Sequence, residues 1–491
     1  MRLNAKQIAN YTGGTFLVDL MDPRALACDI TWDSREVKPG SLFVALPGQK
    51  VDGHAFVRQA LTAGALVVLV SQPIDASTTL LAREMGAAVV EVPNTYSAIT
   101  DLARAWRSQL TGKVIAVTGS TGKTTTKNLV RDVLSAQFSV VATKANQNNE
   151  LGVPRTLLSA NPETQAVVVE MGMRGRGQIS ELCDFVRPDW GLITNVGECH
   201  IELLGSQENI ARAKAELIEA LPDGTGTAFL NASDAFTPYV ADHARVSSRD
   251  VRLVAYSGTP QQAADVSAAA QVWAEDIELD DEGRARFTLH AQGFSLLDEA
   301  DEASLFGTCT LSLRGLHNVH NACAAAAVGR AMGMSLDSIA TALEKAQPEA
   351  GRQQVVKARR GFTVVDDSYN ANPDSMRASL QMFCAMEVPG RRIAVLGDMA
   401  ELGDHAQPCH EGIGRLAAQL PLDKLVCVGP LSAHIAQSAR EAGMNLDKIC
   451  CVDSVAQAIG EVDALVEPGD AVLAKASNCM NLKRVVEGLV N

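Results

Sequence analysis

A short glycine-rich loop between an apolar strand and a helix constrains the fold of this chain more than any other part of its sequence. Residues 114–117 are continuously apolar, as in a strand covered on both faces of a sheet, and residues 126–136 have a helical pattern. The loop between them contains Gly119, Ser120, Thr121, Gly122, Lys123, Thr124 and Thr125. Its glycines allow backbone N–H groups to turn toward phosphate oxygens, and the N-terminus of the following helix favours negative charge. The segment therefore predicts a phosphate-binding loop.

Within this loop, we expect Lys123 to reach the β- and γ-phosphates of a nucleotide and the Thr124 hydroxyl to hold Mg²⁺. The loop reads GxxGK[ST], which is shorter than the usual GxxxxGK[ST] and can more easily arise by chance. A tight strand–helix turn is the structural alternative. That alternative explains neither Lys123 nor the run of three threonines after it, so phosphate binding is the favoured interpretation.

The composition is that of a globular protein with several domains and no broad nucleic-acid surface. A length of 491 residues exceeds one ordinary core, and 47% hydrophobic residues argue against disorder. The net charge of −14 and the 4% aromatic content argue against nucleic-acid binding. The N-terminus lacks the apolar region of a secretory signal, and no apolar run approaches the ~20 residues of a transmembrane helix. The 11 scattered cysteines predict reduced, mostly buried thiols in a cytoplasmic protein.

Strand and helix patterns predict an α/β fold of three domains, at residues 1–94, 95–348 and 349–491. In the first two domains, a helix is expected at 96–110 and strands at 41–46, 65–70, 87–92, 166–169 and 191–194. Residues around 280–283 favour an antiparallel hairpin, and the acidic stretch 297–304 is expected to be an exposed loop. The N-terminal α/β domain is the smaller one, and the central domain has a P-loop ATPase-like parallel sheet.

The third domain alternates strands with helices. Its strands are expected at 363–365, 393–396, 425–428, 449–452 and 471–474. This alternation is typical of a mostly parallel, doubly wound, Rossmann-like sheet. Because no GxGxxG motif follows its first strand, we infer no dinucleotide.

Polar residues outside the loop also stand at positions typical of a site. Glu170 ends an apolar strand, where its carboxylate can hold Mg²⁺; the alternative is a surface glutamate at a strand end. Asn318 and Asn321 share one face of a helix, and their amides can hydrogen-bond the edge of an adenine. A capped helix start is an equally good explanation of that spacing.

The shortened loop and a series of other motifs resemble those of the Mur ligases and their relative folylpolyglutamate synthase. In chain order, the similar segments are residues 31–35, 39–46, 52–54, 148–154, 170–172, 194–202, 315–321, 351–353, 366–373 and 396–403. They span nearly the whole chain. One departure is clear: the family tends to carry Lys-Gly-Ser-Arg near the C-terminus, whereas residues 475–478 read Lys-Ala-Ser-Asn. No role is therefore carried over to an arginine there.

The resemblance implies an ATP-dependent ligase with two Mg²⁺ ions, catalysis by Lys123, His200 and Lys214, and metal ligation by Thr124, Glu170, His200 and Lys214. A lone histidine is more often structural, and a helix lysine more often faces solvent. In the family, the lysine at the position of Lys214 is carbamylated. A pKa lowered by burial would help, because only the neutral amine reacts with CO₂.

The resemblance also implies which groups bind the substrates. ATP would contact residues 119–125, Asn318, Asn321, Arg352 after a hinge, and Asp367 through its ribose. UDP-N-acetylmuramoyl-tripeptide and D-alanyl-D-alanine would contact Asp33, Ser34, Arg35, Asn149, Tyr369, Asn370, Asn372, Asp398 and Met399. Turns at 33–35 and 369–373 and a strand–helix connection at 397–399 are the structural alternatives.

Two other activities stay open at this point. Another Mur ligase or a folylpolyglutamate synthase would use a different amine, and a P-loop nucleotide switch would hydrolyse nucleotide without any amine. The sequence does not decide whether the third residue of the tripeptide is lysine or diaminopimelate. We expect a monomer.

Overall fold

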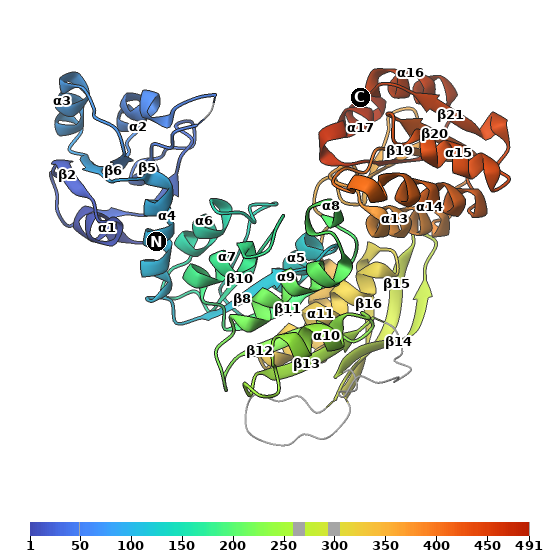
Figure 1. Ribbon diagram of the computed structural model, residues 1–491, viewed down its shortest axis with the longest axis horizontal. Helices are drawn as coiled ribbons and strands as arrows, with labels where there is room; N and C mark the ends of the chain where they lie inside the picture. The colour runs from blue at the N-terminus through green and yellow to red at the C-terminus, as the bar shows by residue number, and fades with distance from the viewer. Residues whose placement is uncertain (49, 259–270, 293–304, 491) are drawn as a thin grey trace. The chain divides into compact units, whose positions relative to one another are not determined.

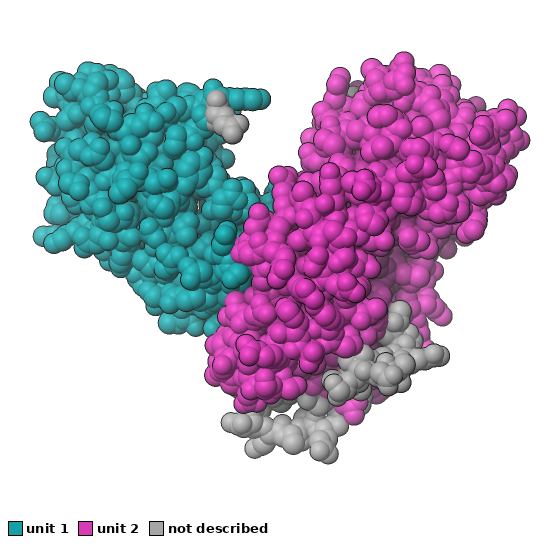
Figure 2. Space-filling model, viewed as in Figure 1, with its two compact units in different colours: residues 1–116, 138–172, 179–190 teal, residues 117–137, 173–178, 191–491 magenta. Residues whose placement is uncertain are grey.

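The computed structural model describes residues 1–48, 50–258, 271–292 and 305–490. They form two compact units (Figure 2). Unit 1 comprises residues 1–116, 138–172 and 179–190, and unit 2 comprises the described parts of 117–137, 173–178 and 191–491. The acidic stretch predicted to be an exposed loop lies outside the described residues.

Unit 1 contains a five-stranded sheet whose order is β2-β7-β6-β5-β4 (Figure 1). Its strands are β2 (Thr15–Val18), β7 (Ala88–Glu91), β6 (Val67–Val70), β5 (Ser41–Val44) and β4 (Asp29–Thr31). All neighbours are parallel except β2 and β7. Helices α2 (Val57–Thr62) and α3 (Ala76–Glu84) contribute to the apolar core over this sheet, as the runs of buried valines require. The three strands predicted for this region are confirmed as β5, β6 and β7.

The remainder of unit 1 is built around helix α4 (Thr95–Arg107), which was predicted at 96–110. It packs against α1 (Ala5–Thr12) and α6 (Gly152–Ser159). The buried Trp106 indole of α4 donates to the carbonyl of Ala160 across 3.0 Å. Strands β9 (Val140–Ala142) and β10 (Ala166–Glu170) pair in parallel, and β10 is the strand predicted at 166–169.

Unit 2 begins with the end of β8 (Lys113–Thr118), the phosphate loop and α5 (Lys123–Ser135). Five strands follow in the order β16-β15-β14-β13-β12. Their bounds are β12 (Thr227–Asn231), β13 (Arg252–Ser257), β14 (Val272–Leu279), β15 (Arg284–Ala291) and β16 (Leu305–Arg314). The antiparallel pair β14–β15 confirms the predicted hairpin. Helix α11 (His317–Ala331), which is buried on nearly all sides, packs against α5.

The C-terminal part of unit 2 forms a six-stranded sheet of order β17-β18-β22-β19-β20-β21. Its strands are β17 (Gln354–Lys357), β18 (Thr363–Asp366), β22 (Ala471–Lys475), β19 (Arg392–Gly397), β20 (Lys424–Val428) and β21 (Ile449–Val452). Only β17 is antiparallel, so the predicted doubly wound sheet is confirmed. Helices α16 (Val455–Leu465) and α17 (Lys483–Val490) cover one face, while α13 (Pro373–Ala385), α14 (Ala406–Gln419) and α15 (Ala433–Glu441) lie on the other (Figure 1).

Two further expectations concern membrane-spanning helices and the burial of the cysteines. Within the described ranges, no helix combines the length and apolar character needed to span a membrane. All eleven cysteines are free thiols, as predicted, but only five are fully buried. The expectation that most are buried is therefore wrong: three are exposed and three are half-buried, including both cysteines of the edge strand β21.

Candidate active site

Two glycines fix the shape of the phosphate loop between β8 and α5. Gly119 has a φ of +152°, and a Cβ atom there would lie 1.8 Å from the hydroxyl oxygen of Thr194. Gly122 has a φ of +76°, and its Cβ would lie 2.7 Å from Oδ1 of Asn321. Only glycine fits both positions, because each combines positive φ with a close neighbour.

The loop is held by the chain segment that follows β11 (Trp190–Ile193). The N–H of Thr121 donates to Oδ1 of Asn195 at 2.9 Å, and the Thr194 hydroxyl donates to the carbonyl of Thr121 at 2.6 Å. The N–H of Gly197 donates to the Ser120 hydroxyl at 2.8 Å. These contacts connect the loop with residues about 75 positions further along the chain, and they stabilise its conformation.

Lys123 begins α5, and its side chain folds back over the loop. Its Nζ donates to the carbonyls of Gly119 at 2.7 Å and Ser120 at 3.3 Å. Gly122 precedes the helix and offers no side chain to cap the first turn, so the turn's N–H groups suit an anion. The residues predicted from Gly119 to Thr125 thus form the loop and the first turn of α5, and the Lys123 ammonium group lies over the loop.

Arg352 reaches this loop from the segment before β17. Its Nη2 donates to the Thr124 hydroxyl at 3.1 Å, and its guanidinium carbon lies 4.3 Å from the centre of the Tyr369 ring. A hydrogen bond of 2.5 Å between Asn128 of α5 and Glu349 anchors the same segment. The structure therefore brings Arg352 to the phosphate loop.

Asn318 and Asn321 share one face of α11, as their spacing predicted. The Asn321 amide donates to Oδ1 of Asn318 at 2.8 Å, and its own Oδ1 accepts from the Thr126 hydroxyl at 3.0 Å. The Asn318 amide donates to the carbonyl of Arg314 at 2.7 Å. The capped helix start is wrong as an explanation, because Leu316 precedes α11 without a side-chain cap.

Lys214 is fully buried on α9 (Gln207–Glu219), so a solvent-facing lysine is ruled out. Burial, together with the positive charge of Lys123, lowers its pKa from 10.5 to about 7. Cys199 and Asp234 act in the opposite direction. The lowered pKa increases the neutral fraction of this amine, and carbamylation requires the neutral form.

His200 lies in the same region, in a left-handed backbone conformation with a φ of +64°. Its Nδ1 is 2.6 Å from Oε2 of Glu401. The neighbouring thiol of Cys199 has a pKa of about 7: burial raises it, but a hydrogen bond with His200 and the charges of Lys123 and Lys214 lower it further. All three predicted catalytic residues therefore act on the pKa of one buried thiol.

Asp234 is a site residue that the sequence analysis missed. It follows β12, and its carboxylate accepts from the N–H groups of Val196 at 2.6 Å and Phe236 at 2.8 Å. Burial raises its pKa, and the charge of Lys214 acts against that rise. A carboxylate soon after an apolar strand was the available signal, the same one that identified Glu170.

Glu170 is buried at the end of β10 in unit 1, so the surface alternative is wrong. Its Oε1 accepts from the Asn148 amide at 2.8 Å, and its N–H donates to the Thr143 hydroxyl at 2.9 Å. The next residue after Asn148, Asn149, accepts from the N–H of Gly152 at 3.0 Å.

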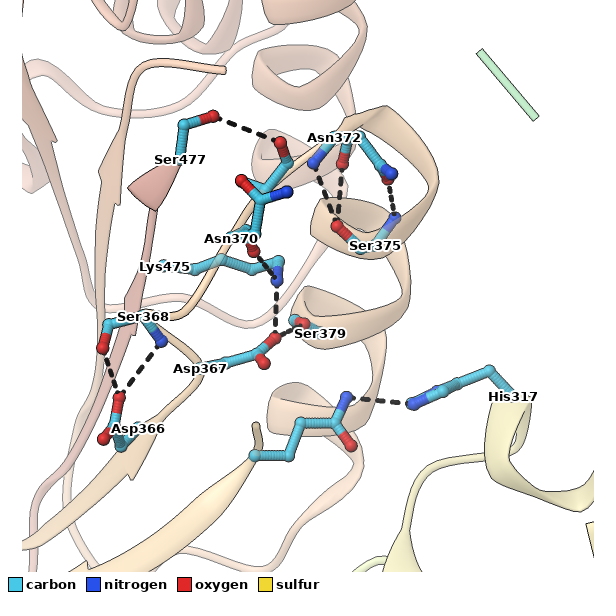
Figure 3. A network of polar contacts seen from close by, with 12 residues as sticks. His317, Asp366, Asp367, Ser368, Asn370, Asn372, Ser375, Ser379, Lys475 and Ser477 are labelled. Carbon is cyan, nitrogen blue, oxygen red and sulfur yellow. Dashed lines mark hydrogen bonds and ion pairs between the residues drawn. The ribbon is translucent and has the colours of Figure 1, made fainter. Parts of the chain in front are cut away.

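Asp367 lies in a buried polar network at the end of β18 (Figure 3). Its carboxylate is 2.7 Å from Nζ of Lys475 and accepts from the Ser379 hydroxyl. Lys475 also donates to the carbonyl of Asn370 at 2.9 Å. The Lys-Ala-Ser-Asn segment thus holds the loop in which Asp367, Tyr369 and Asn370 were predicted to bind ligands.

Three other predicted substrate residues have structural roles. Asn372 forms a capping box with Ser375 at the start of α13, so the turn explanation describes this part of the loop (Figure 3). The side chain of Met399 is fully buried, and Asp398 accepts from the N–H of Ser432 at 2.7 Å. These contacts favour the structural alternative for Met399 and Asn372.

A turn after β4 contains Asp33, Ser34 and Arg35, of which Arg35 is exposed and the other two are half-buried. The guanidinium of Arg35 is 2.6 Å from the Asp33 carboxylate, and this hydrogen bond is the main reason why the pKa of Asp33 is only about 2. Ser34 donates to Oε1 of Gln59 at 3.1 Å. The turn alternative is right about the shape of this segment, which still offers polar groups at the surface.

Each unit, taken by itself, contains oxygen donors of the kind that Mg²⁺ prefers. In unit 1 this is the Glu170 carboxylate; in unit 2 it is the Thr124 hydroxyl, and a carbamylated Lys214 would add two more oxygens. Within the described parts of the chain, no three His, Cys, Asp or Glu side chains form a metal cage on their own.

Known proteins match this chain from end to end. Family models described as the Mur ligase family catalytic domain, the Mur ligase middle domain and the Mur ligase glutamate ligase domain match residues 29–107, 117–329 and 351–478. A UDP-N-acetylmuramoyl-tripeptide–D-alanyl-D-alanine ligase of Mycobacterium bovis is 38% identical over 526 residues, covering 100% of this chain and 98% of that protein.

Solved structures match as well. A crystal structure of MurF from Acinetobacter baumannii has a TM-score of 0.81 and 32% identity, covering 100% of this chain and 99% of that one. MurF ligase from Thermotoga maritima in complex with ADP has a TM-score of 0.74 and 26% identity, covering 94% and 97%. The predicted α/β fold is confirmed by these likenesses.

A parallel sheet, a glycine-rich loop and a lysine at the start of the next helix define a P-loop nucleotide-binding protein. Beyond that class, the similarity over the full length is decisive: the chain belongs to the Mur ligase family.

Proposed function

We propose that this chain is an ATP-dependent ligase that joins D-alanyl-D-alanine to UDP-N-acetylmuramoyl-tripeptide in the synthesis of the peptidoglycan precursor. One observation carries the proposal: 38% identity, over the whole length, to a protein named for this reaction. The ADP bound to the Thermotoga maritima relative supports ATP as the phosphoryl donor.

The proposed reaction has two steps. A carboxylate oxygen of the tripeptide attacks the γ-phosphorus of ATP, which forms an acyl-phosphate and releases ADP. The amine of D-alanyl-D-alanine then attacks the acyl carbon, loses a proton, and expels inorganic phosphate from a tetrahedral intermediate. ATP is needed because forming an amide from a free carboxylate is unfavourable in water.

In the first step, Lys123 and the N–H groups at the start of α5 would bind the phosphates. Arg352 is supported as a second cation by its contact with Thr124. Asn318, Asn321 and Asp367 are proposed to hold the adenine and ribose. Burial of these groups favours exclusion of water, which could otherwise hydrolyse the acyl-phosphate.

We propose Thr124, Glu170, His200 and carbamylated Lys214 as the ligands of two Mg²⁺ ions. When bound, Mg²⁺ would neutralise charge on the phosphoryl oxygens. The buried position and low pKa of Lys214 support its carbamylation.

The nucleotide sugar is proposed to bind at Asp33, Ser34, Arg35 and Asn149. The dipeptide is proposed to bind near Tyr369 and Asn370, with Asn372, Asp398 and Met399 supporting the surrounding backbone. The corresponding proposed domains are residues 1–94, 95–348 and 349–491. We also propose that the enzyme acts as a monomer in the cytoplasm, in keeping with its free thiols.

The test is to incubate the purified chain with ATP, the tripeptide precursor and D-alanyl-D-alanine and to weigh the product by mass spectrometry. The expected result is one pentapeptide product, one ADP and one phosphate per turnover. A product formed only with another amine would identify a different ligase of the family. Phosphate release that is equal with and without both acceptor substrates would instead identify a nucleotide switch.

A further inference from the structure

Arg155 is outside the predicted nucleotide-sugar turn but contacts the residues that flank it on both sides. Arg155 lies on α6 in unit 1, and its Nη2 is 2.6 Å from Oε2 of Glu36. Its guanidinium carbon lies 5.3 Å from the centre of the Trp32 ring. Trp32 and Glu36 immediately flank Asp33, Ser34 and Arg35, so one side chain contacts the residue before the turn and the residue after it.

Within the turn, the N–H of Glu36 donates to the Asp33 carbonyl and the N–H of Arg35 donates to the Asp33 carboxylate, each at 3.0 Å. The Asp33–Arg35 ion pair is exposed, with 83% of the arginine side chain accessible, and such pairs contribute little to a defined conformation. Glu36 receives a further hydrogen bond of 3.2 Å from the Thr31 hydroxyl. Arg155 is less exposed, at 26%, and a planar guanidinium can stack on an aromatic ring while it pairs with a carboxylate.

The helix that carries Arg155 is itself anchored beside other proposed site residues. Asn149 accepts from the N–H of Gly152 at the start of α6, and Asn148 donates to Glu170. The same short helix therefore connects the nucleotide-sugar turn with the Asn149 and Glu170 region of unit 1.

We propose that Arg155 is a positioning residue for the nucleotide-sugar substrate: it holds Trp32 and Glu36 so that the turn between them keeps the conformation that binds uridine diphosphate. This inference rests on the proposed function. Arg155 acts through the turn and touches no reacting group, so its loss weakens nucleotide-sugar binding and leaves the chemical step intact.

The experiment compares full-length Arg155→Ala and Arg155→Lys with the wild type. For the alanine variant, we expect KM for the nucleotide-sugar substrate to rise about tenfold, with kcat and KM for ATP unchanged. The lysine variant should show a smaller rise, because it keeps the charge but not the planar stacking group. Calorimetric titration with UDP should show the same order of affinities.

Arg104→Ala is the matched control, because Arg104 also forms ion pairs within unit 1, with Asp101 at 2.8 Å and Asp184 at 2.6 Å. It should leave every constant unchanged. Glu36→Gln removes the partner charge and should raise the same KM, which keeps the test available if Arg155→Ala does not fold.

An unchanged KM for the nucleotide-sugar substrate in Arg155→Ala, or in Glu36→Gln if the alanine variant does not fold, would overturn the proposal. A parallel fall of kcat and rise of KM for ATP would also overturn it, because that pattern reflects general damage. If the wild-type chain bound no UDP, the proposed function itself would fail, which is a distinct outcome from a variant that binds as the wild type does.

Discussion

The Nζ atom of Lys475 lies 2.7 Å from a carboxylate oxygen of Asp367, and both side chains are buried (Figure 3). The two residues stand at the ends of β22 and β18, which are parallel neighbours in the C-terminal sheet. Because Lys475 also donates to the carbonyl of Asn370, the pair fixes the start of the loop that leads into α13.

Replacing Lys475 with methionine should destabilise the chain strongly. The substitution leaves a buried carboxylate without its partner, which lowers the free energy of unfolding by about 3–5 kcal/mol. Urea denaturation followed by circular dichroism measures this. Lys483→Met is the control: Lys483 pairs with Glu487 at the surface, so its loss should change the free energy by less than about 1 kcal/mol. Equal effects of the two substitutions would contradict the assigned role.

Lys214→Ala should reduce ligase activity by on the order of 100-fold or more, the usual effect of removing one electrostatic group from a site. If the lysine acts as a carbamate, short carboxylic acids should restore part of the activity by supplying the lost oxygens. Lys214→Arg is the control, since arginine is a long basic side chain like lysine but cannot be carbamylated, and acids should not rescue it. Full activity of the alanine variant without added acid would exclude the carbamate.

The lowered pKa of His317 leads us to expect that the folded chain loses stability at acidic pH. Burial lowers the pKa of this imidazole to about 4, and the Gln353 amide donates to its Nε2 at 3.0 Å. The unfolded chain, with a pKa near 6.5, therefore binds more protons than the folded one between pH 6.5 and 4. Stability should fall as the pH drops through this window, by up to about 3 kcal/mol from this group.

The measurement for His317 is the urea midpoint at several pH values, compared between the wild type and His317→Gln. Glutamine does not titrate, so the variant should lose less stability between pH 6.5 and 4. Identical pH profiles would show that other groups cause the loss.

The strands that could be predicted from the sequence are those covered on both faces. Strands such as β19 and β22 are apolar except for one charged residue at an end, because a parallel sheet between two helical layers leaves no face for polar residues. β17 was missed: its residues are half-buried, it pairs on one side only, and no apolar run identifies it. Strand ends shifted by one or two residues, since backbone hydrogen bonds and not hydropathy set them.

The part of the site that could be predicted is the part whose residues are consecutive in the sequence. The phosphate loop is such a motif, because strand, glycines, lysine and helix are consecutive. The contacts that hold it are not local: Asn195 reaches Thr121, and Arg352 reaches Thr124 from 228 residues away. Neither the ion pair of Lys475 with Asp367 nor the burial of Lys214 could be read from spacing, because both depend on how the sheets and helices pack.

The last prediction concerns Asp234, which was identified only from the structure. Its two carboxylate oxygens each accept one backbone N–H, from Val196 and Phe236, and its charge acts on Lys214. Asp234→Asn keeps one acceptor and removes the charge. We expect kcat to fall by roughly 10- to 100-fold, about 1.4–2.7 kcal/mol, with KM for D-alanyl-D-alanine unchanged.

Asp242→Asn is the control for this substitution, because Asp242 lies on the same segment after β12, in α10 (Thr237–His243), but its side chain is exposed. It should behave as the wild type in stability and in kcat. Because the backbone of Val196 leads directly to Gly197 and thus to Ser120 of the phosphate loop, Asp234→Asn should also weaken ATP binding measured by calorimetry. A variant with normal kcat and normal ATP affinity would show that the carboxylate only caps two N–H groups.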